Sequence, residues 1–233
     1  MNVWVYVEGE SDKYALEALW KKWREELRTA GHGIKIIPLD NKAKYFQKIG
    51  ARVARIITDN VEDIVIGLPD LYPNKEFEKT EYKHDNIEEI KQVQIREVKG
   101  ALLNVFNVNE LKHEELLKRF LPSSFKHDLE MLLLAAKDQL RTYLGTDDHL
   151  GKWKNPVEEQ NQGRPPKRIV QELFRTKTSN KRAYRETTDA VAILRKVIDI
   201  RSIIFDKNGQ VQCPVFKEVI DWIGNKTEIL AYH

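Results

Sequence analysis

Two acidic residues in the first third of the chain each follow a short apolar segment. Glu8 comes directly after "VWVYV" and precedes Gly9, and Asp70 stands three residues after "DIVIG". Mg²⁺ prefers carboxylate oxygens and keeps several waters, so one to three carboxylates are enough to hold it. Glu8 therefore suits a magnesium ligand or a general base, although capping the next helix or pairing with a lysine explains it equally well. Asp70 taken alone also fits an ordinary loop.

The first 73 residues show the pattern that would bring these two carboxylates together. Short apolar segments, typical of buried strands, alternate with helical spacings of large apolar residues. We expect strands at 3–7, 34–39 and 63–67, and helices with apolar stripes over 16–27 and 45–57. Such β-α-β-α-β order predicts right-handed crossovers and a parallel sheet. Sites in these sheets form beyond the carboxyl ends of the strands, where both Glu8 and Asp70 fall.

A third acidic group stands where another extended segment meets a helix. In "RFLPSSFKHDLEMLLLAAKDQLRTYLG", residues 120–126 are extended, Asp128 and Glu130 follow, and a helix is expected to run to Gly145. Asp128 could simply cap this helix and Glu130 could be a solvated acid of its first turn. The preceding stretch, about 74–119, is charged and mostly helical, and we interpret it as an insertion without chemistry of its own.

The last third of the chain contains a basic segment. From Arg164 to Arg185 there are eight lysines or arginines and one acid. Such clusters contact phosphates through charge and bidentate hydrogen bonds, although a solvated surface explains many of them equally well. The imbalance favours an anionic partner, bound by Arg164, Lys167, Arg168, Lys181, Arg182 and Arg185. We expect an α/β core over 1–145 and a basic, mostly helical part over 146–233.

Composition excludes several classes of protein. No stretch approaches the ~18 continuous apolar residues of a membrane span, and the start lacks the features of a signal peptide, so a cytoplasmic protein is expected. The single cysteine, Cys213, rules out an internal disulfide and a cysteine-based zinc cage. Phosphate-binding loops, dinucleotide fingerprints and nucleophile elbows are absent from the sequence. The net charge of +3 does not by itself identify a partner.

The segment "VYVEGESDKYALEAL" resembles the first motif of Toprim domains, which occur in topoisomerases, primases and OLD-type nucleases. In that family a strand ends in Glu-Gly, here Glu8-Gly9, and an Asp-x-Asp motif follows the third strand. The corresponding residues here are Asp70 and Tyr72, so the second aspartate is replaced. A resemblance over nearly the whole chain links it to a Toprim-like bacterial and archaeal family of unknown function, often encoded beside AAA or ABC-type ATPases. The matching segments are "VEGESD", "DLYP", "KHDLEMLLL", "RPPKRI", "NKRAYRETTDAVAIL" and "CPVFKEVIDWI".

These resemblances imply a Toprim-like parallel-sheet core and a metal-dependent nuclease acting on DNA or RNA in phage defence, with an ATPase partner. Glu8, Asp70 and Glu130, together with Asp128, would hold Mg²⁺ or Mn²⁺, and Lys167 would neutralise a phosphate during catalysis. A non-catalytic module that binds nucleic acid or an ATPase is the alternative, which the replaced aspartate favours. A magnesium-dependent phosphatase or nucleotidyl transferase is a third reading. A homo-oligomer is compatible with all three.

Overall fold

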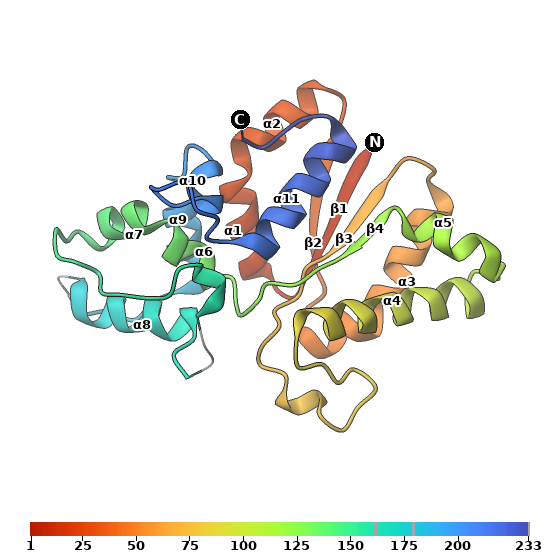
Figure 1. The fold of residues 1–233 in the computed structure, drawn as a ribbon, viewed down its shortest axis with the longest axis horizontal. Helices are drawn as coiled ribbons and strands as arrows, with labels where there is room; N and C mark the ends of the chain where they lie inside the picture. Colours follow the sequence, from red (N-terminus) through yellow and green to blue (C-terminus); the bar gives the residue numbers. More distant parts are fainter. Residues whose placement is uncertain (161–162, 179, 233) are drawn as a thin grey trace. The chain divides into compact units, whose positions relative to one another are not determined.

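The computed structural model describes residues 1–160, 163–178 and 180–232, which form two compact units (Figure 1). The first unit comprises Met1–Lys13 and Glu26–Lys126, and the second comprises Tyr14–Glu25 and His127–His233. The last change of unit along the chain falls at 126/127, after the last strand. The segment 14–25 belongs to the second unit because its tryptophans pack there: the Trp20 ring stacks on Phe216, with 6.2 Å separating the centroids, and Trp23 donates to the carbonyl of Ile229.

The first unit contains a four-stranded sheet. Its strands are β1 (Asn2–Val7), β2 (Gly33–Pro38), β3 (Ile64–Gly67) and β4 (Phe120–Pro122), in the spatial order β2-β1-β3-β4. All three pairings are parallel, so the predicted α/β class with a parallel sheet is confirmed. The register sets Val3 beside both Ile34 and Ile64. Because β1 and β3 are neighbours, residues that follow them meet at one edge of the sheet.

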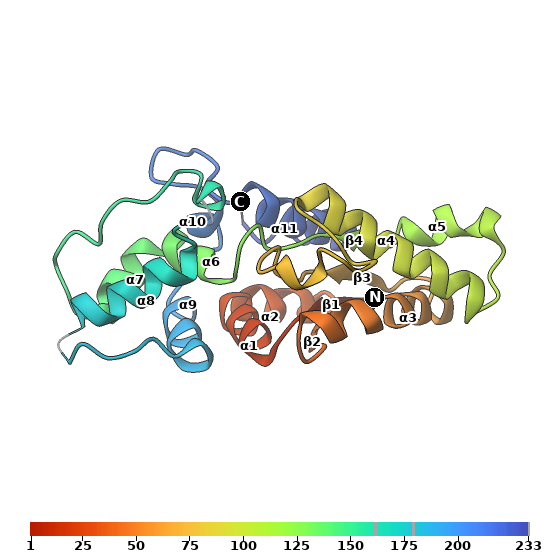
Figure 2. The same cartoon turned by 90° about the horizontal axis from the view of Figure 1, so that it is seen from below.

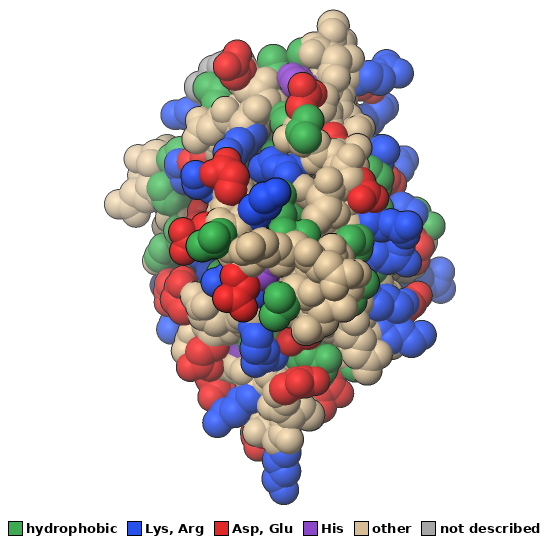
Figure 3. All heavy atoms as spheres, turned by 90° about the vertical axis from the view of Figure 1, so that its right-hand side faces the viewer, with side chains coloured by type: hydrophobic (Ala, Val, Ile, Leu, Met, Phe, Trp, Pro, Cys, Tyr) green, Lys and Arg blue, Asp and Glu red, His purple; other side chains and the backbone are tan. Residues whose placement is uncertain are grey.

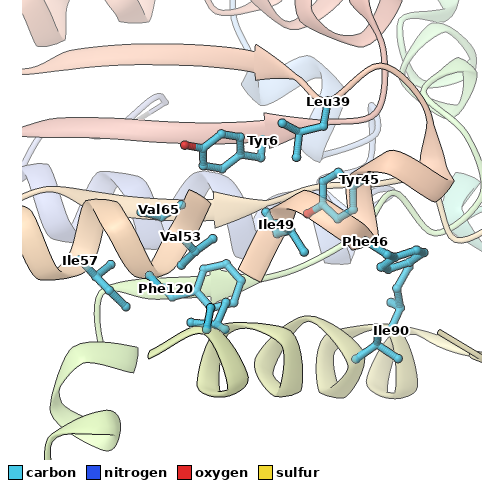
Figure 4. Packing of buried hydrophobic residues seen from close by; sticks show 14 of the residues in the cluster. Tyr6, Leu39, Tyr45, Phe46, Ile49, Val53, Ile57, Val65, Ile90 and Phe120 are labelled. Atoms are coloured by element: carbon cyan, nitrogen blue, oxygen red, sulfur yellow. The ribbon is translucent and has the colours of Figure 1, made fainter. Parts of the chain in front are cut away.

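Two long helices, α3 (Lys42–Asp59) and α4 (Ile87–Asn104), run side by side against one face of this sheet (Figures 1 and 2). Asn41 caps α3 by accepting a hydrogen bond from the Lys44 amide. The core between sheet and helices is mainly apolar (Figure 4), and within it the buried Tyr45 hydroxyl donates to the Gln94 side chain at 2.8 Å. The helices approach so closely that a Cβ at Gly50 would overlap the carbonyl of Glu97. This packing fixes the start of α3, where one residue of the candidate site lies.

The remaining elements of the first unit are short. The 3-10 turns η1 (Lys75–Phe77) and η2 (Glu110–Lys112) and the helix α5 (His113–Leu117) occupy the predicted insertion, together with α4. Helix α1 (Glu10–Leu19) begins in the first unit and continues in the second, whereas α2 (Lys21–Thr29) begins in the second and ends in the first. The single helix expected over 16–27 is therefore two helices that meet at Trp20.

The second unit is helical. Its elements are α6 (Glu130–Ala135), α7 (Lys137–Leu144), η3 (Val157–Glu159), α8 (Pro166–Lys177), a π-helical turn η4 (Glu186–Ala190), α9 (Val191–Leu194), α10 (Arg201–Ile204) and α11 (Pro214–Thr227). Gly145 ends α7 in the left-handed conformation, as predicted. The predicted helix before it is broken at Ala136, whose ψ of 44° departs from helical geometry. Helix α8 lies against α6 and α7.

A membrane-spanning segment and cysteine-based chemistry were both excluded from the sequence. Within residues 1–160, 163–178 and 180–232, no helix is both long enough and apolar enough to cross a membrane. Cys213 is buried, and burial raises the pKa of its thiol well above the ordinary value, so the thiol is unsuited to nucleophilic chemistry. The face of the molecule shown in Figure 3 carries acidic and basic side chains interspersed with one another.

Candidate functional site

Glu8 and Asp70 lie next to each other at the carboxyl ends of β1 and β3. The backbone amide of Asp70 donates a hydrogen bond to Oε1 of Glu8 at 3.0 Å, although 62 residues separate the two in sequence. Asp70 also pairs with Phe125 in an isolated parallel bridge, which extends the contact of β3 with the chain beyond β4. The order of strands in the sheet thus brings the Glu8 carboxylate to the backbone of Asp70.

Asp12 belongs to the same acidic group. It is buried, and its Oδ2 accepts a hydrogen bond from the Gly9 amide at 2.9 Å. Asp12 is the third residue of α1, so this hydrogen bond satisfies the amide of Gly9, which directly precedes the helix. This contact holds a second carboxylate close to Glu8.

Lys42 is the residue of this site that sequence reasoning missed. Its side chain is only 5% exposed, and its ammonium donates to the carbonyls of Leu71 and Pro73, both at 2.9 Å. Through these two hydrogen bonds, Lys42 links the start of α3 to the turn that contains Asp70. A signal existed in the sequence, since Lys42 continues the apolar stripe formed by Tyr45, Phe46 and Ile49 at helical spacing.

The charges of the site are perturbed by burial. Burial raises the pKa of Glu8 from 4.5 to about 7; the charge of Lys42 opposes this rise, and the charge of Asp12 adds to it. Burial also lowers the pKa of the Lys42 ammonium, against the charges of Glu8 and Asp70. A desolvated carboxylate with acidic neighbours gains from a nearby cation, and perturbed pairs of this kind are common at functional sites.

The donor set fits Mg²⁺ bound through few protein ligands. The Glu8 carboxylate would offer a hard oxygen, and Mg²⁺ would keep water at most of its other positions. No group of three or more His, Cys, Asp or Glu side chains in the described part of the chain forms a ready-made metal cage. Tyr72, which replaces the second aspartate of the Toprim pattern, donates its hydroxyl to the carbonyl of Asp85 at 3.2 Å.

The other predicted acidic residues, Asp128 and Glu130, lie in the second unit. Oδ2 of Asp128 accepts the backbone amide of Lys167 at 3.2 Å, so this carboxylate sits at the N-terminus of α8, where the helix dipole favours it. Glu130 is the first residue of α6 and is 4% exposed. The side chain of Lys167 pairs with Glu186 at 2.7 Å. That Asp128 and Glu130 complete the ligands of Glu8 and Asp70 stays a prediction.

Charges in this second group are also perturbed. Burial raises the pKa of both Asp128 and Glu130, and the charge of Asp128 raises that of Glu130 further, while Lys167 opposes both shifts. Burial lowers the pKa of Lys167, but its hydrogen bond to Glu186 and the nearby acids outweigh burial and leave the pKa raised. The group therefore combines two carboxylates that hold protons at unusually high pH with one firmly charged ammonium.

Most residues of the predicted phosphate-binding segment already pair with acids. Arg164 and Arg168 both reach Glu172, at 3.0 and 3.5 Å. Arg182 makes a bidentate pair with Asp189, at 2.7 and 2.8 Å, and Asp189 is only 3% exposed. Asp189 also accepts the Arg185 amide and the Tyr143 hydroxyl. Arg182 thus has a structural contact, because its guanidinium neutralises a buried carboxylate. Lys181 and Arg185 have exposed side chains in the described structure.

A four-stranded parallel sheet with carboxylates beyond its strand ends defines an α/β protein with an acidic strand-end site. The chain belongs to the DUF4276 family, a domain of unknown function, whose profile matches residues 7–223. No curated protein matches the chain.

Two solved structures of the C-terminal region of the OLD protein from Xanthomonas campestris pv. campestris are similar to it. They are 11% and 14% identical, cover 83% of this chain and 94% and 91% of their own, and have TM-scores of 0.34 and 0.31. Structural similarity at these TM-scores does not identify a function for this chain.

Proposed function

We propose that this protein is a Mg²⁺-dependent enzyme that cleaves phosphodiester bonds in nucleic acid. The observation that supports it most is the adjacency of Glu8 and Asp70 at the strand ends, where the Asp70 backbone amide donates a 3.0 Å hydrogen bond to the Glu8 carboxylate. Burial holds the pKa of Glu8 at about 7, so its carboxylate would gain from a divalent cation. The resemblance to Toprim proteins extends the proposal to a role in phage defence with an ATPase partner.

Each residue of the strand-end group has a distinct role in this proposal. Glu8 and Asp70 hold the ion, and Asp12 keeps the loop at Gly9 in place. Lys42 fixes the turn that carries Asp70 through its bonds to the Leu71 and Pro73 carbonyls. The bound Mg²⁺ would supply Lewis-acid polarisation of the scissile phosphate and an activated water.

The group in the second unit has complementary chemistry. Glu130, whose pKa is raised by burial, is suited to exchange a proton near neutral pH. Lys167 keeps its charge and is suited to stabilise the negative charge that develops on phosphate oxygens. Its ion pair with Glu186 has to open or share the ammonium when a phosphate binds.

A nuclease panel with Mg²⁺ or Mn²⁺ on single- and double-stranded DNA and RNA tests the proposal. Wild-type protein should cleave at least one substrate, and Glu8→Gln should abolish cleavage. Glu10→Gln is the matched control, because Glu10 is an exposed carboxylate two residues away that pairs only with the nearby Lys13 among the contacts described. Equal activity of the wild type and Glu8→Gln would refute the assignment.

A non-catalytic binding module is the second candidate. Tyr72 stands where the Toprim pattern has an aspartate, and its hydroxyl is engaged with the Asp85 carbonyl. This function predicts nucleic-acid or ATPase binding that survives Glu8→Gln, and no cleavage with any metal. Cleavage that depends on Glu8 would exclude it.

A further inference from the structure

The loop that joins α7 to η3 in the second unit presents an aromatic ring in a basic hollow. The hollow has a volume of about 290 Å³, and Trp153, which is half-buried, is the aromatic residue of its lining. Its lining consists of Leu134, Lys137, His149, Gly151, Lys152, Trp153, Lys154, Asn155, Val157 and Gln212. Three lysines and one histidine line it, and among the described residues no acid does. Small-molecule sites commonly begin at about 300 Å³.

The lysines of this hollow differ from those of the segment 164–185. The Lys137 ammonium lies 5.0 Å from the centre of the Trp153 ring, in a cation–π contact. Lys152 and Lys154 are exposed. None of the three forms an ion pair with a described carboxylate, whereas Arg164, Arg168 and others of the later segment do. Their charge is therefore available to an anion.

Hydrogen bonds hold the loop in place on both sides of Trp153. Upstream, the Gly151 amide donates to Nδ1 of His149 at 2.9 Å. Downstream, the Lys154 amide donates to the Gln160 side chain at 3.0 Å, and the Asn155 side chain donates to Asp206 at 2.8 Å. The ring is thus presented by backbone that is already ordered, which lowers the entropic cost of binding.

A second, larger hollow of about 700 Å³ continues from the first and shares Lys137 and Gln212 with it. It contains acids as well as bases, but its acids have partners: Asp138 pairs with Lys207 at 3.2 Å, and Asp199 accepts the Arg201 amide at 2.8 Å. Arg141 also lines this hollow, and its Nε is buried without a hydrogen-bond partner among the described residues. An extended anion that begins at Trp153 could continue toward this guanidinium.

We propose that the hollow around Trp153 binds an unstacked base of single-stranded nucleic acid, with the flanking phosphates on Lys152 and Lys154. An aromatic ring next to unpaired lysines is the arrangement by which single strands are held without regard to sequence, since every base offers a flat face. A base within a duplex is already stacked on its neighbours and cannot reach a ring inside a hollow. The site deepens the proposed function by naming the form of the substrate.

Binding is measured by anisotropy of a fluorescein-labelled oligo-dT of about 15 nucleotides, in EDTA so that no cleavage intervenes. Trp153→Ala should weaken binding roughly 5- to 150-fold, the range for loss of one stacked base, and Trp153→Phe should retain most of it. The double variant Lys152→Gln/Lys154→Gln should reduce the slope of log affinity against log salt by about 1.4, or 0.7 per phosphate.

Trp222→Ala is the matched control. Trp222 is equally half-buried and has its own cation–π partner, Lys226, at 5.7 Å, but it does not line the hollow. This variant should bind like the wild type. The proposal is overturned if Trp153→Ala binds like the wild type, if Trp222→Ala loses as much, or if duplex DNA binds as tightly with the same dependence on Trp153. Equal affinity for the mononucleotide dTMP would also overturn it in favour of a free-nucleotide site.

Binding in EDTA requires neither the metal nor Glu8, so the binding assay tests the Trp153 site independently of the proposed nuclease activity. Unimpaired single-strand binding together with absent cleavage would support the Trp153 site and remove the catalytic assignment. Loss of Trp153-dependent binding with intact cleavage would do the reverse.

Discussion

Replacing Glu8 by glutamine should stabilise the fold at high pH in the absence of metal. A pKa raised from 4.5 to about 7 means that the folded protein favours the protonated carboxyl. The stabilisation by this proton is complete below pH 4.5 and is lost as the pH rises through 7. At 1.36 kcal/mol per pKa unit the full loss is about 3 kcal/mol. Glutamine never ionises and avoids it.

Two contacts set the size of this effect. The glutamine oxygen can still accept the Asp70 amide, so the hydrogen bond at 3.0 Å is preserved. The attraction between Glu8 and Lys42 is already included in the pKa of about 7, and the Lys42 ammonium keeps the carbonyls of Leu71 and Pro73 in the variant. The difference between variant and wild type isolates Glu8 from Asp128 and Glu130, whose raised pKa values affect both proteins alike.

Urea unfolding followed by tryptophan fluorescence in EDTA measures this difference. The free energy of unfolding of Glu8→Gln minus that of the wild type should be near zero at pH 4.5 and should rise through pH 7 toward about 3 kcal/mol. Glu10→Gln, at an exposed position, should show no such rise. A difference that stays constant with pH, or a variant that is less stable at pH 8, would refute the argument that Glu8 is a desolvated carboxylate.

Two further substitutions test the supporting contacts. Lys42→Met leaves the Leu71 and Pro73 carbonyls without their donor. It should therefore lower the free energy of unfolding by about 1–3 kcal/mol in the same urea assay. An unchanged free energy of unfolding would show that the turn does not need the ammonium. Arg182→Met breaks the ion pair with buried Asp189 and should lower the free energy of unfolding by about 3 kcal/mol. The salt dependence of nucleic-acid binding should stay unchanged. A reduced salt slope with an unchanged free energy of unfolding would instead show that Arg182 contacts a phosphate.

The placement of Glu8 and Asp70 could be predicted because it depends only on strand order. Alternation of apolar strands and amphipathic helices predicts a parallel sheet, and the carboxyl ends of neighbouring parallel strands share an edge. Lys42 could not be recognised with the same ease, because a lysine on an apolar stripe is normally read as a break in the pattern. Its burial is compensated by two carbonyls that lie 29 and 31 residues away.

The basic segment shows where counting charges misleads. Between 164 and 185 the count gives seven net positive charges, but Glu186 and Asp189 lie just beyond this window and neutralise Lys167 and Arg182. The hollow at Trp153 could not be predicted from the sequence, because too few charges mark it. Lys152 and Lys154 are few in number, and only the folded loop reveals that they surround an aromatic ring and lack acidic partners.

Calorimetric titration with Mn²⁺ at pH 8 tests most directly whether Glu8 and Asp70 hold a divalent cation. The wild type and the control Glu10→Gln should bind the ion with the same affinity. Glu8→Gln and Asp70→Asn should each weaken binding at least about tenfold, since even residues that only support metal ligands cost that much when replaced. Wild-type protein that binds no Mn²⁺, or variants that bind it as tightly as the wild type, would contradict the account.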